Sequence, residues 1–328
     1  MQYLGEIISL VVAVSWTFAA LFSEGASKRL GTLPFNIIRM VLSIVLLSIG
    51  MWVYVGSPLP MNADNETWLW LILSGLVGYV FGDICLFNAY LTIGSRFGQL
   101  LMTLAPIAAA MAGWCVLGEG MSWKGVAGMC IVVSGIALSV LNRGTDAEHH
   151  HRLSLKLPLR GVLYGIGAGV GQGVGLVLSK VGMNAYEMHI KDVMKEMSSL
   201  GTQQMLEPMR AELEFMPFTA TWMRAVAGLV GFIIVMTVVR QWRKLPAAVS
   251  NRRGMACALG AVITGPTIGV SLSLMATLYT SAGVAQTLMS LTPIIILVPT
   301  YYIYKQRVTP MEVLGAVIAV AGASLFFI

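Results

Sequence analysis

A few ionisable side chains lie inside long apolar stretches of the chain, where such groups are energetically costly. Asp83 is the leading example, in GYVFGDICLFNAYL, and Asn88 and Tyr90 follow on the same segment. As a carboxylate, Asp83 could bind a proton or an amine-bearing substrate. It could instead form a structural ion pair with Arg39 or Arg224. Because ionisable groups at membrane depth mark pathways and also pair structurally, both interpretations stay open.

The composition indicates that lipid is the solvent for most of this chain. Of 328 residues, 57% are hydrophobic and only 11% are charged, with a mean hydropathy of +0.79. An ordinary soluble domain carries roughly a quarter charged residues. A bilayer core takes about 20 apolar residues as a helix, so we expect an all-α integral membrane protein of ten transmembrane helices. The predicted spans are 5–23, 35–55, 68–91, 97–117, 123–141, 161–181, 218–239, 255–279, 284–304 and 310–328.

The sequence repeats itself after five of these spans. LMTLAPI at 101–107 returns as LMSLTPI at 288–294, an offset of 187 that also relates the span after each phrase. The repeat predicts a five-helix unit at 1–141 and a second at 161–328, joined by a polar loop at 142–160. Since five is odd, the second unit should have the inverted orientation. Short connections such as TIGSRFG predict tight turns between antiparallel helices.

The basic residues predict a topology for the ten helices. Odd-numbered loops hold 14 of the 21 Lys and Arg residues, the other side of the membrane holds five, and two lie inside spans. The positive-inside rule then places the odd-numbered loops in the cytoplasm and both termini outside the cell inner membrane.

The repeated residues resemble a known family. Each unit has a Pro in its fourth helix followed by two Gly, and LGEGMSWKGVAGMCIVVSGIAL is similar to the Gly-Glu turn that joins the fourth and fifth helices of EamA-type transporters, within the drug/metabolite transporter superfamily. Gln306 occupies the position of Glu119 in the second unit, so that copy departs from the pattern. The residues that carry the resemblance are Pro106, Gly128, Gly135, Pro293, Gly315 and Gly322.

The resemblance implies a central cavity lined by helices one, three, four, six, eight and nine. Inverted-repeat transporters bind substrate near the midplane between their units. An aromatic residue there could stack on a solute, although packing is its commoner role, and hydroxyls often bond their own helix. The candidate substrate-binding residues are Trp16, Asp83, Asn88, Tyr90, Gln99, Gln172, Thr267, Ser271 and Gln286.

Other residues are candidates for bending or gating. Pro106, Pro266 and Pro293 remove backbone donors inside spans, so they predict either static kinks or hinges. Glu119 is predicted to cap the next helix or to meet a charge from the facing unit, with gating as the alternative. Gln306 would perform only the neutral part of that role. Arg39 and Arg224 lie near helix ends, where they could snorkel or form a structural pair, with substrate binding as the alternative.

Three polar or glycine-rich segments have simpler interpretations. GAGVGQGVG at 167–175 predicts close helix packing rather than phosphate binding, because it lies within a span. The insert at about 183–216 predicts an amphipathic helix on the outer membrane face. His149, His150 and His151 lie in a flexible loop without a defined geometry, so we expect neither a metal site nor another cofactor.

The expected function is secondary transport of a small organic metabolite, such as an amino acid, a related solute or an amphipathic drug. This range follows from the family resemblance alone, as does alternating access for export or exchange. Proton coupling is the one coupling mode that the residues suggest. The expected surroundings are the bilayer and the small-molecule substrate, with no nucleic acid, in a monomer or homodimer. An enzyme is not expected, and the alternative is a membrane scaffold or a lipid flippase-like protein.

Overall fold

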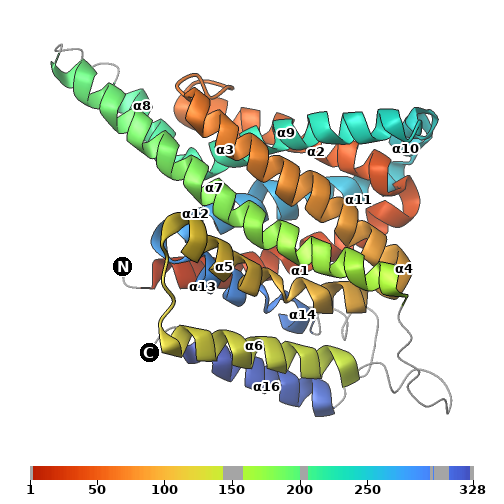
Figure 1. Cartoon of the computed structure of the whole chain (residues 1–328). Helices are drawn as coiled ribbons and strands as arrows, with labels where there is room; N and C mark the ends of the chain where they lie inside the picture. Colours follow the sequence, from red (N-terminus) through yellow and green to blue (C-terminus); the bar gives the residue numbers. More distant parts are fainter. Residues whose placement is uncertain (1–2, 143–157, 200–205, 296–297, 299–309, 326–328) are drawn as a thin grey trace. The chain divides into compact units, whose positions relative to one another are not determined.

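A computed structural model describes residues 3–142, 158–199, 206–295, 298 and 310–325, and these residues form helices and no strands. Among these described residues, six helices are long and apolar enough to cross a membrane. The elements are α1 (Leu4–Leu30), α2 (Thr32–Val55), α3 (Asn65–Gly75), η1 (Leu76–Asp83), α4 (Ile84–Met102), α5 (Ala105–Leu117), α6 (Trp123–Asn142), α7 (Leu159–Ser199), α8 (Leu206–Glu214), α9 (Met216–Val238), η3 (Trp242–Lys244), α10 (Leu245–Ser250), α11 (Arg252–Val262), η4 (Ile263–Val270), α12 (Ser271–Tyr279), α13 (Ala282–Met289), α14 (Thr292–Ile295) and α16 (Pro310–Ser324) (Figure 1).

The contacts group the chain into two compact units that do not follow the order of the sequence. The first compact unit holds Met1–Thr17, Phe81–Val174 and Ala276–Ile328, and the second holds Phe18–Val80 and Gly175–Met275. Each therefore combines residues from both halves of the chain. The two five-helix units predicted from the repeat are a different division, and they stay a prediction.

In the first compact unit, α6 and α16 lie side by side along their length (Figure 1). Two glycines allow this approach: a Cβ on Gly135 would lie 2.6 Å from the nitrogen of Ala319, and one on Gly322 would lie 2.8 Å from the nitrogen of Val132. Gly135 and Gly322 are 187 positions apart, and so are Val132 and Ala319, so each contact is the repeat equivalent of the other. The two helices thus pack reciprocally, as small residues allow in membrane proteins.

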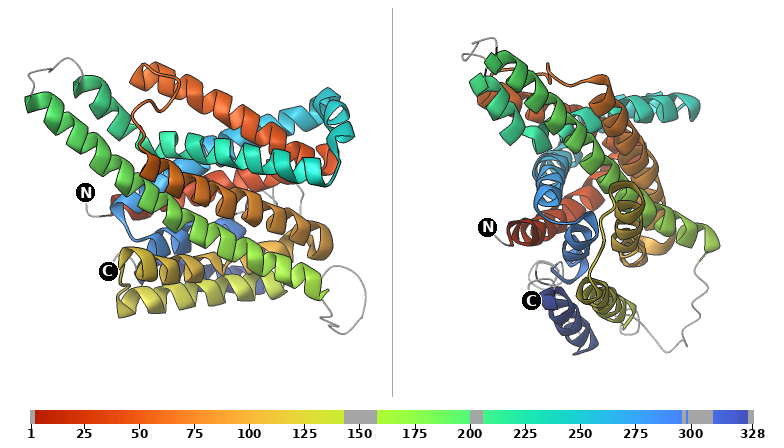
Figure 2. Two further views of the ribbon diagram at one scale, coloured as in Figure 1. Left: turned by 45° about the horizontal axis from the view of Figure 1, so that its top comes forward. Right: turned by 60° about the vertical axis from the view of Figure 1, so that its left-hand side comes forward.

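The second compact unit is built around α9, which packs against α2 and α3 (Figure 2). The indole nitrogen of Trp222 donates to the hydroxyl of Ser48 at 2.8 Å, and its ring meets Trp68 edge to face. Ser271 donates to Thr221 at 3.0 Å, so buried hydroxyls also bond across helices here.

A π-helical segment interrupts the third helix of each repeat at the same place. η1 and η4 are 187 positions apart, and so are the helices before them, α3 and α11. Their sequences, LVGYVFGD and ITGPTIGV, share glycines at the third and seventh positions. Pro266 lies in η4, but η1 has Tyr79 at that position and forms the same segment. Proline is therefore not required for the π geometry, although it was the only residue we expected to disturb this helix.

The repeated phrase adopts the same broken helix twice. The chain leaves α4 after Met102 and restarts with Ala105, and it leaves α13 after Met289 and restarts with Thr292. At each break the second of the two linking residues is a leucine, and its N–H donates to the carbonyl oxygen three residues earlier. Leu104 donates to Leu101 at 3.1 Å, and Leu291 donates to Leu288 at 3.2 Å. Pro106 and Pro293 follow at the second position of the new helix, where a missing N–H costs nothing.

The chain reverses direction at TIGSRFG, as predicted, although α4 extends through this segment to Met102. A Cβ on Gly167 of α7 would meet Cys85 and one on Gly169 would meet Leu101, whereas a straight helix would separate Cys85 from Leu101 by about 24 Å. The second repeat does break at the equivalent place, between α12 and α13, where the Ser281 hydroxyl accepts the N–H of Val284 at 3.4 Å. The first repeat has Gly94 at the position of Ser281, which offers no capping oxygen.

The predicted insert is not a separate surface helix along its whole length. Residues 183–199 continue α7, whose 41 residues span about 60 Å against a bilayer core of about 30 Å. Tyr186 and Ile190 of the predicted apolar stripe are fully buried. Buried Glu212 on α8 accepts hydrogen bonds from the Tyr186 hydroxyl and from the Asn62 side chain. The extension is thus fixed to the rest of the second compact unit.

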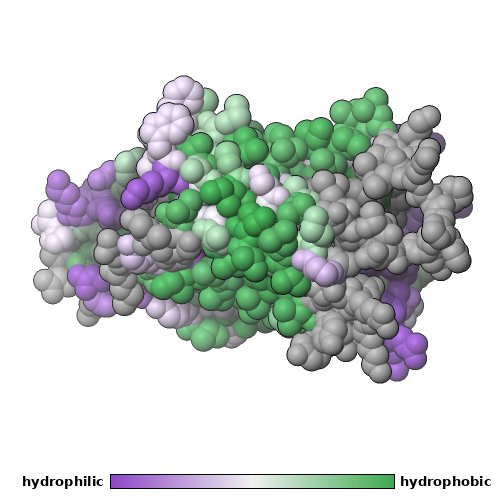
Figure 3. Space-filling view, turned by 90° about the horizontal axis from the view of Figure 1, so that it is seen from below, coloured by the Kyte–Doolittle hydropathy of each residue, from purple (hydrophilic) through white to green (hydrophobic). Residues whose placement is uncertain are grey.

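Much of the outer surface is apolar. The face in Figure 3 is mostly hydrophobic over its described residues, with hydrophilic side chains gathered toward its ends. Large apolar side chains on α6 and α16, such as Trp123, Val313, Val317 and Val320, are exposed. A soluble monomer rarely exposes so large an apolar surface, whereas a bilayer covers it.

The caps of the third helices repeat as well. The Asp64 carboxylate accepts the N–H of Thr67 at 3.1 Å, and Asn251 accepts the N–H of Gly254 at 3.0 Å, 187 positions later. Partial burial raises the pKa of Asp64, but the hydrogen bonds from Thr67 outweigh this effect and, with nearby His189, hold the pKa below its ordinary value. The charged form is therefore the one that the fold stabilises.

Replacing Asp64 with Ala removes this cap and should lower the free energy of unfolding by about 1 kcal/mol. Asp64→Asn should cost much less, because Asn251 makes the same bond in the second repeat. The carboxylate's contribution is complete above the ordinary aspartate pKa and declines as the pH falls through the lower folded-state pKa, so Asp64→Asn should remove that dependence. Unfolding of the detergent-purified protein measures both effects, and equal losses for the two variants would contradict the cap.

Candidate functional site

Asp83 and Gln172 come together in the first compact unit. Asp83 ends η1 and is 4% exposed, and the amide nitrogen of half-buried Gln172 on α7 donates to its Oδ1 at 3.2 Å. A buried carboxylate is costly unless hydrogen bonds or charges compensate for it. Both residues were predicted site residues on different helices, and π segments often occur at functional sites.

Glycines on α7 place Gln172 close to the helices that surround it. A Cβ on Gly169 would lie 2.9 Å from the carbonyl oxygen of Leu101, and one on Gly173 would lie 2.4 Å from that of Ala105. On another side, a Cβ on Gly167 would meet the Cys85 sulfur at 3.0 Å. The glycine-rich stretch therefore serves close helix packing, as predicted.

The remaining predicted residues are spread over both compact units. Half-buried Trp16, half-buried Asn88 and buried Gln286 belong to the first, and the Asn88 amide donates to the carbonyl of Ile84 on its own helix. Thr267 and Ser271 belong to the second, where Ser271 donates to Thr221. The side chains of Tyr90 and Gln99, and the whole of Gln306, lie outside the described residues.

The two intramembrane arginines form one cluster in the second compact unit. The guanidinium carbons of Arg39 and Arg224 lie 5.8 and 4.8 Å from the centre of the Tyr79 ring. Arg39 is 8% exposed and Arg224 is 4% exposed, so both side chains are buried within the protein. A cation–π contact with an aromatic ring is an attractive interaction that a guanidinium group can make in apolar surroundings. Asp83 belongs to the other compact unit, so an ion pair with these arginines stays a prediction.

Glu119 caps a helix, but not the next one as we predicted. Its Oε2 accepts the N–H of Ala282, the first residue of α13, at 3.0 Å, while Ser122 accepts the N–H of Gly125 at 3.1 Å and so caps α6. A carboxylate at a helix N-terminus interacts favourably with the helix dipole. Glu119 thus links the turn of the first repeat to the fourth helix of the second, a long-range contact that no local pattern reveals.

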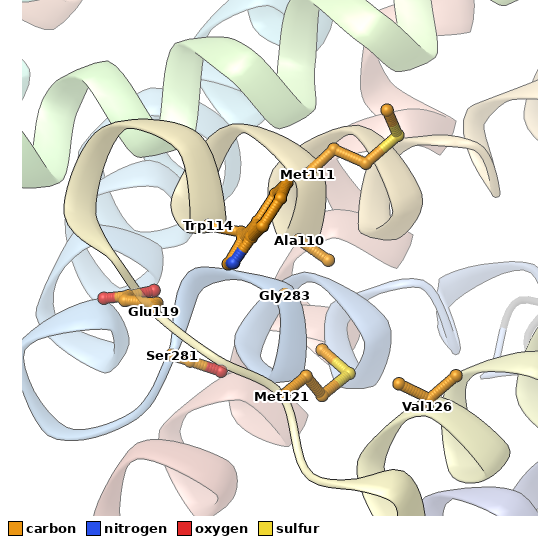
Figure 4. Close-up of a pocket in the computed structure, with 8 residues that line it drawn as sticks. All are labelled: Ala110, Met111, Trp114, Glu119, Met121, Val126, Ser281 and Gly283. Carbon is orange, nitrogen blue, oxygen red and sulfur yellow. The ribbon is translucent and has the colours of Figure 1, made fainter.

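A cavity of about 250 Å³ adjoins this cap. Figure 4 shows Trp114 of α5 above the start of α13, with Glu119 and Ser281 on one side and Met121 and Val126 on the other. The lining is mainly apolar with one carboxylate. Sequence reasoning missed Trp114, because a tryptophan near a helix end is usual at any membrane interface.

The part of the chain that is described contains no candidate metal site. No group of three or more His, Cys, Asp or Glu residues there could hold an ion. His149, His150 and His151 lie outside that part.

Comparisons with known proteins agree on the kind of protein. The model of the EamA-like transporter family matches residues 3–141 and 209–328. The chain is 23% identical over 135 residues to the uncharacterized transporter YoaV of Bacillus subtilis (strain 168), a match that spans 41% of this chain and 46% of that protein. A solved structure, described only as the crystal structure of a protein, superposes with a TM-score of 0.67 over 99% of this chain and 97% of its own at 13% identity, which shows the fold alone.

Proposed function

Because the chain belongs to the EamA-like transporter family, we propose that it is a secondary transporter that moves a small organic metabolite by alternating access. Membership supports an integral, multi-pass membrane protein and points to a transporter rather than an enzyme. Its direction, in this proposal, is export or exchange across the inner membrane. The substrate is an amino acid, a related solute or an amphipathic drug.

The observation that carries the mechanism is the repeat of the backbone. The π segments, the helix breaks and the caps before the third helices recur 187 positions apart. Inverted-repeat transporters exchange the conformations of two such copies around a central site. We therefore propose ten transmembrane helices in two inverted five-helix repeats, with both termini outside.

The proposal as a whole is tested by finding the solute. Cells with and without the protein should differ in the retained and released amounts of one solute or a few related ones, in an untargeted metabolite comparison. The purified protein in liposomes should then transport that solute with saturable kinetics. Flux that does not saturate would indicate a channel, and activity on lipids alone would indicate a flippase.

Proton coupling is proposed to depend on Asp83. Asp83→Asn keeps an amide group opposite Gln172 but cannot carry a proton, so downhill exchange should persist while dependence on a pH gradient is lost. Uptake into liposomes with and without an imposed gradient measures this. Exposed Asp192 offers a matched control, and Asp192→Asn should behave as the unchanged protein. Unchanged gradient dependence in Asp83→Asn would exclude this role.

The inverted topology predicts that residues 142–160 lie in the cytoplasm. A reporter that is active only in the cytoplasm should work when it is inserted in this loop and fail when it is fused to either terminus. A reporter that is active only outside should give the opposite pattern. Detection of the loop outside would overturn the orientation.

A further inference from the structure

A second cavity in the first compact unit carries charges of both signs. It has a volume of about 260 Å³ and lies beside the start of α1, the turn before α6 and the start of α13. It shares Met121 and Ser281 with the cavity beside Trp114 but none of its residues with the Asp83–Gln172 pair. Pockets for drug-sized ligands are usually larger, so this volume suits a small metabolite.

Glu6 forms the acidic wall of this cavity. It is only 9% exposed, and its Oε1 accepts a hydrogen bond from the Thr280 hydroxyl at 2.9 Å. Its Oε2 is buried and has no hydrogen-bond partner among the described residues. A buried carboxylate oxygen without a donor is costly, and an arriving ammonium group would supply that donor.

Lys124 forms the basic wall. It is exposed and lines the same cavity as Glu6, yet the two form no ion pair in the part of the chain that is described. Two opposite charges that face one cavity without neutralising each other suit a ligand that carries both charges. Such a ligand would place its ammonium against Glu6 and its oxyanion against Lys124.

Two serine hydroxyl groups line the cavity together with Lys124. The oxygens of Ser122 and Ser281 already accept backbone N–H bonds as helix caps, from Gly125 and Val284. A hydroxyl that accepts in this way still has its own hydrogen to donate. Both line the cavity, so both can donate to an oxyanion beside Lys124. The apolar lining comes from Met121, Val284 and Leu325.

We propose that this cavity binds a small zwitterion, with its ammonium group on Glu6 and its oxyanion on Lys124, Ser122 and Ser281. A free aliphatic amino acid has this chemistry, and so does the ethanolamine phosphate head group of a lipid. The inference does not rest on the proposed transport function, because binding here can be measured without any flux.

The test uses ligands that carry one charge or both. Binding of L-leucine to the full-length protein in detergent is measured by calorimetry and compared with 3-methylbutylamine, which lacks the carboxylate, and 4-methylpentanoate, which lacks the ammonium. Glu6→Gln should weaken leucine and the amine at least about tenfold and leave the acid unchanged, since losing one charged contact has about this effect. Lys124→Gln should weaken leucine and the acid and leave the amine unchanged.

Matched controls come from the exposed pair on the same helix as Glu6. Glu24→Gln and Lys28→Gln remove one acid and one base that pair at 2.6 Å in the second compact unit, and they should leave all three affinities unchanged. Because Lys124 is exposed, its variant tests the proposal even if Glu6→Gln fails to fold.

A lipid arm separates the two sources of the zwitterion. The protein is placed in phosphatidylcholine nanodiscs with and without phosphatidylethanolamine, and its thermal unfolding is compared. Stabilisation by phosphatidylethanolamine that Glu6→Gln and Lys124→Gln both abolish, without leucine binding, would assign the site to the lipid head group. Binding that neither variant changes, or no binding of either ligand, would overturn the proposal.

Discussion

The need to satisfy every backbone hydrogen bond inside the membrane governs where this chain can interrupt its helices. Lipid offers no partner for a freed N–H, so each interruption must bring its own. Between α12 and α13 the partners are Ser281, which accepts from Val284, and Glu119, which accepts from Ala282. At the equivalent place in the first repeat stands Gly94, and α4 reverses direction between Ile93 and Leu101. Both repeats therefore turn at this place, and the second repeat caps its new helix with a serine.

The same constraint explains why the backbone repeats more faithfully than the side chains do. The π segments share two glycines, and the breaks after Met102 and Met289 share a proline two residues into the next helix. These residues decide how the backbone groups are satisfied, so they recur. Side chains that do not affect the backbone hydrogen bonds are free to differ between the copies.

The sequence predicted the membrane environment, the repeat and the packing role of the glycine stretch, because each depends on composition or spacing. It also placed Asp83 and Gln172 among the site residues, which the structure brings within 3.2 Å. It missed the π segments, because η1 contains no proline and its glycines resemble ordinary packing glycines. It missed the partner of Glu119, because Ala282 is 163 positions away and offers only its backbone. Contacts between a side chain and a distant backbone group leave no periodic pattern to detect.

The differences between the repeats concentrate the polar chemistry in the first copy of the third helix. By the repeat offset, Asp83 corresponds to Val270 and Tyr79 corresponds to Pro266. Asp83 thus has an apolar residue as its counterpart in the second copy. Tyr79, four residues earlier on η1, provides the ring beside both buried arginines, and a proline could provide no such ring. At this position of the third helix, the first copy carries an ionisable group and the second carries Val270. If the two copies exchange roles during transport, protonation of Asp83 would bias the exchange in one direction, which two chemically identical copies could not do.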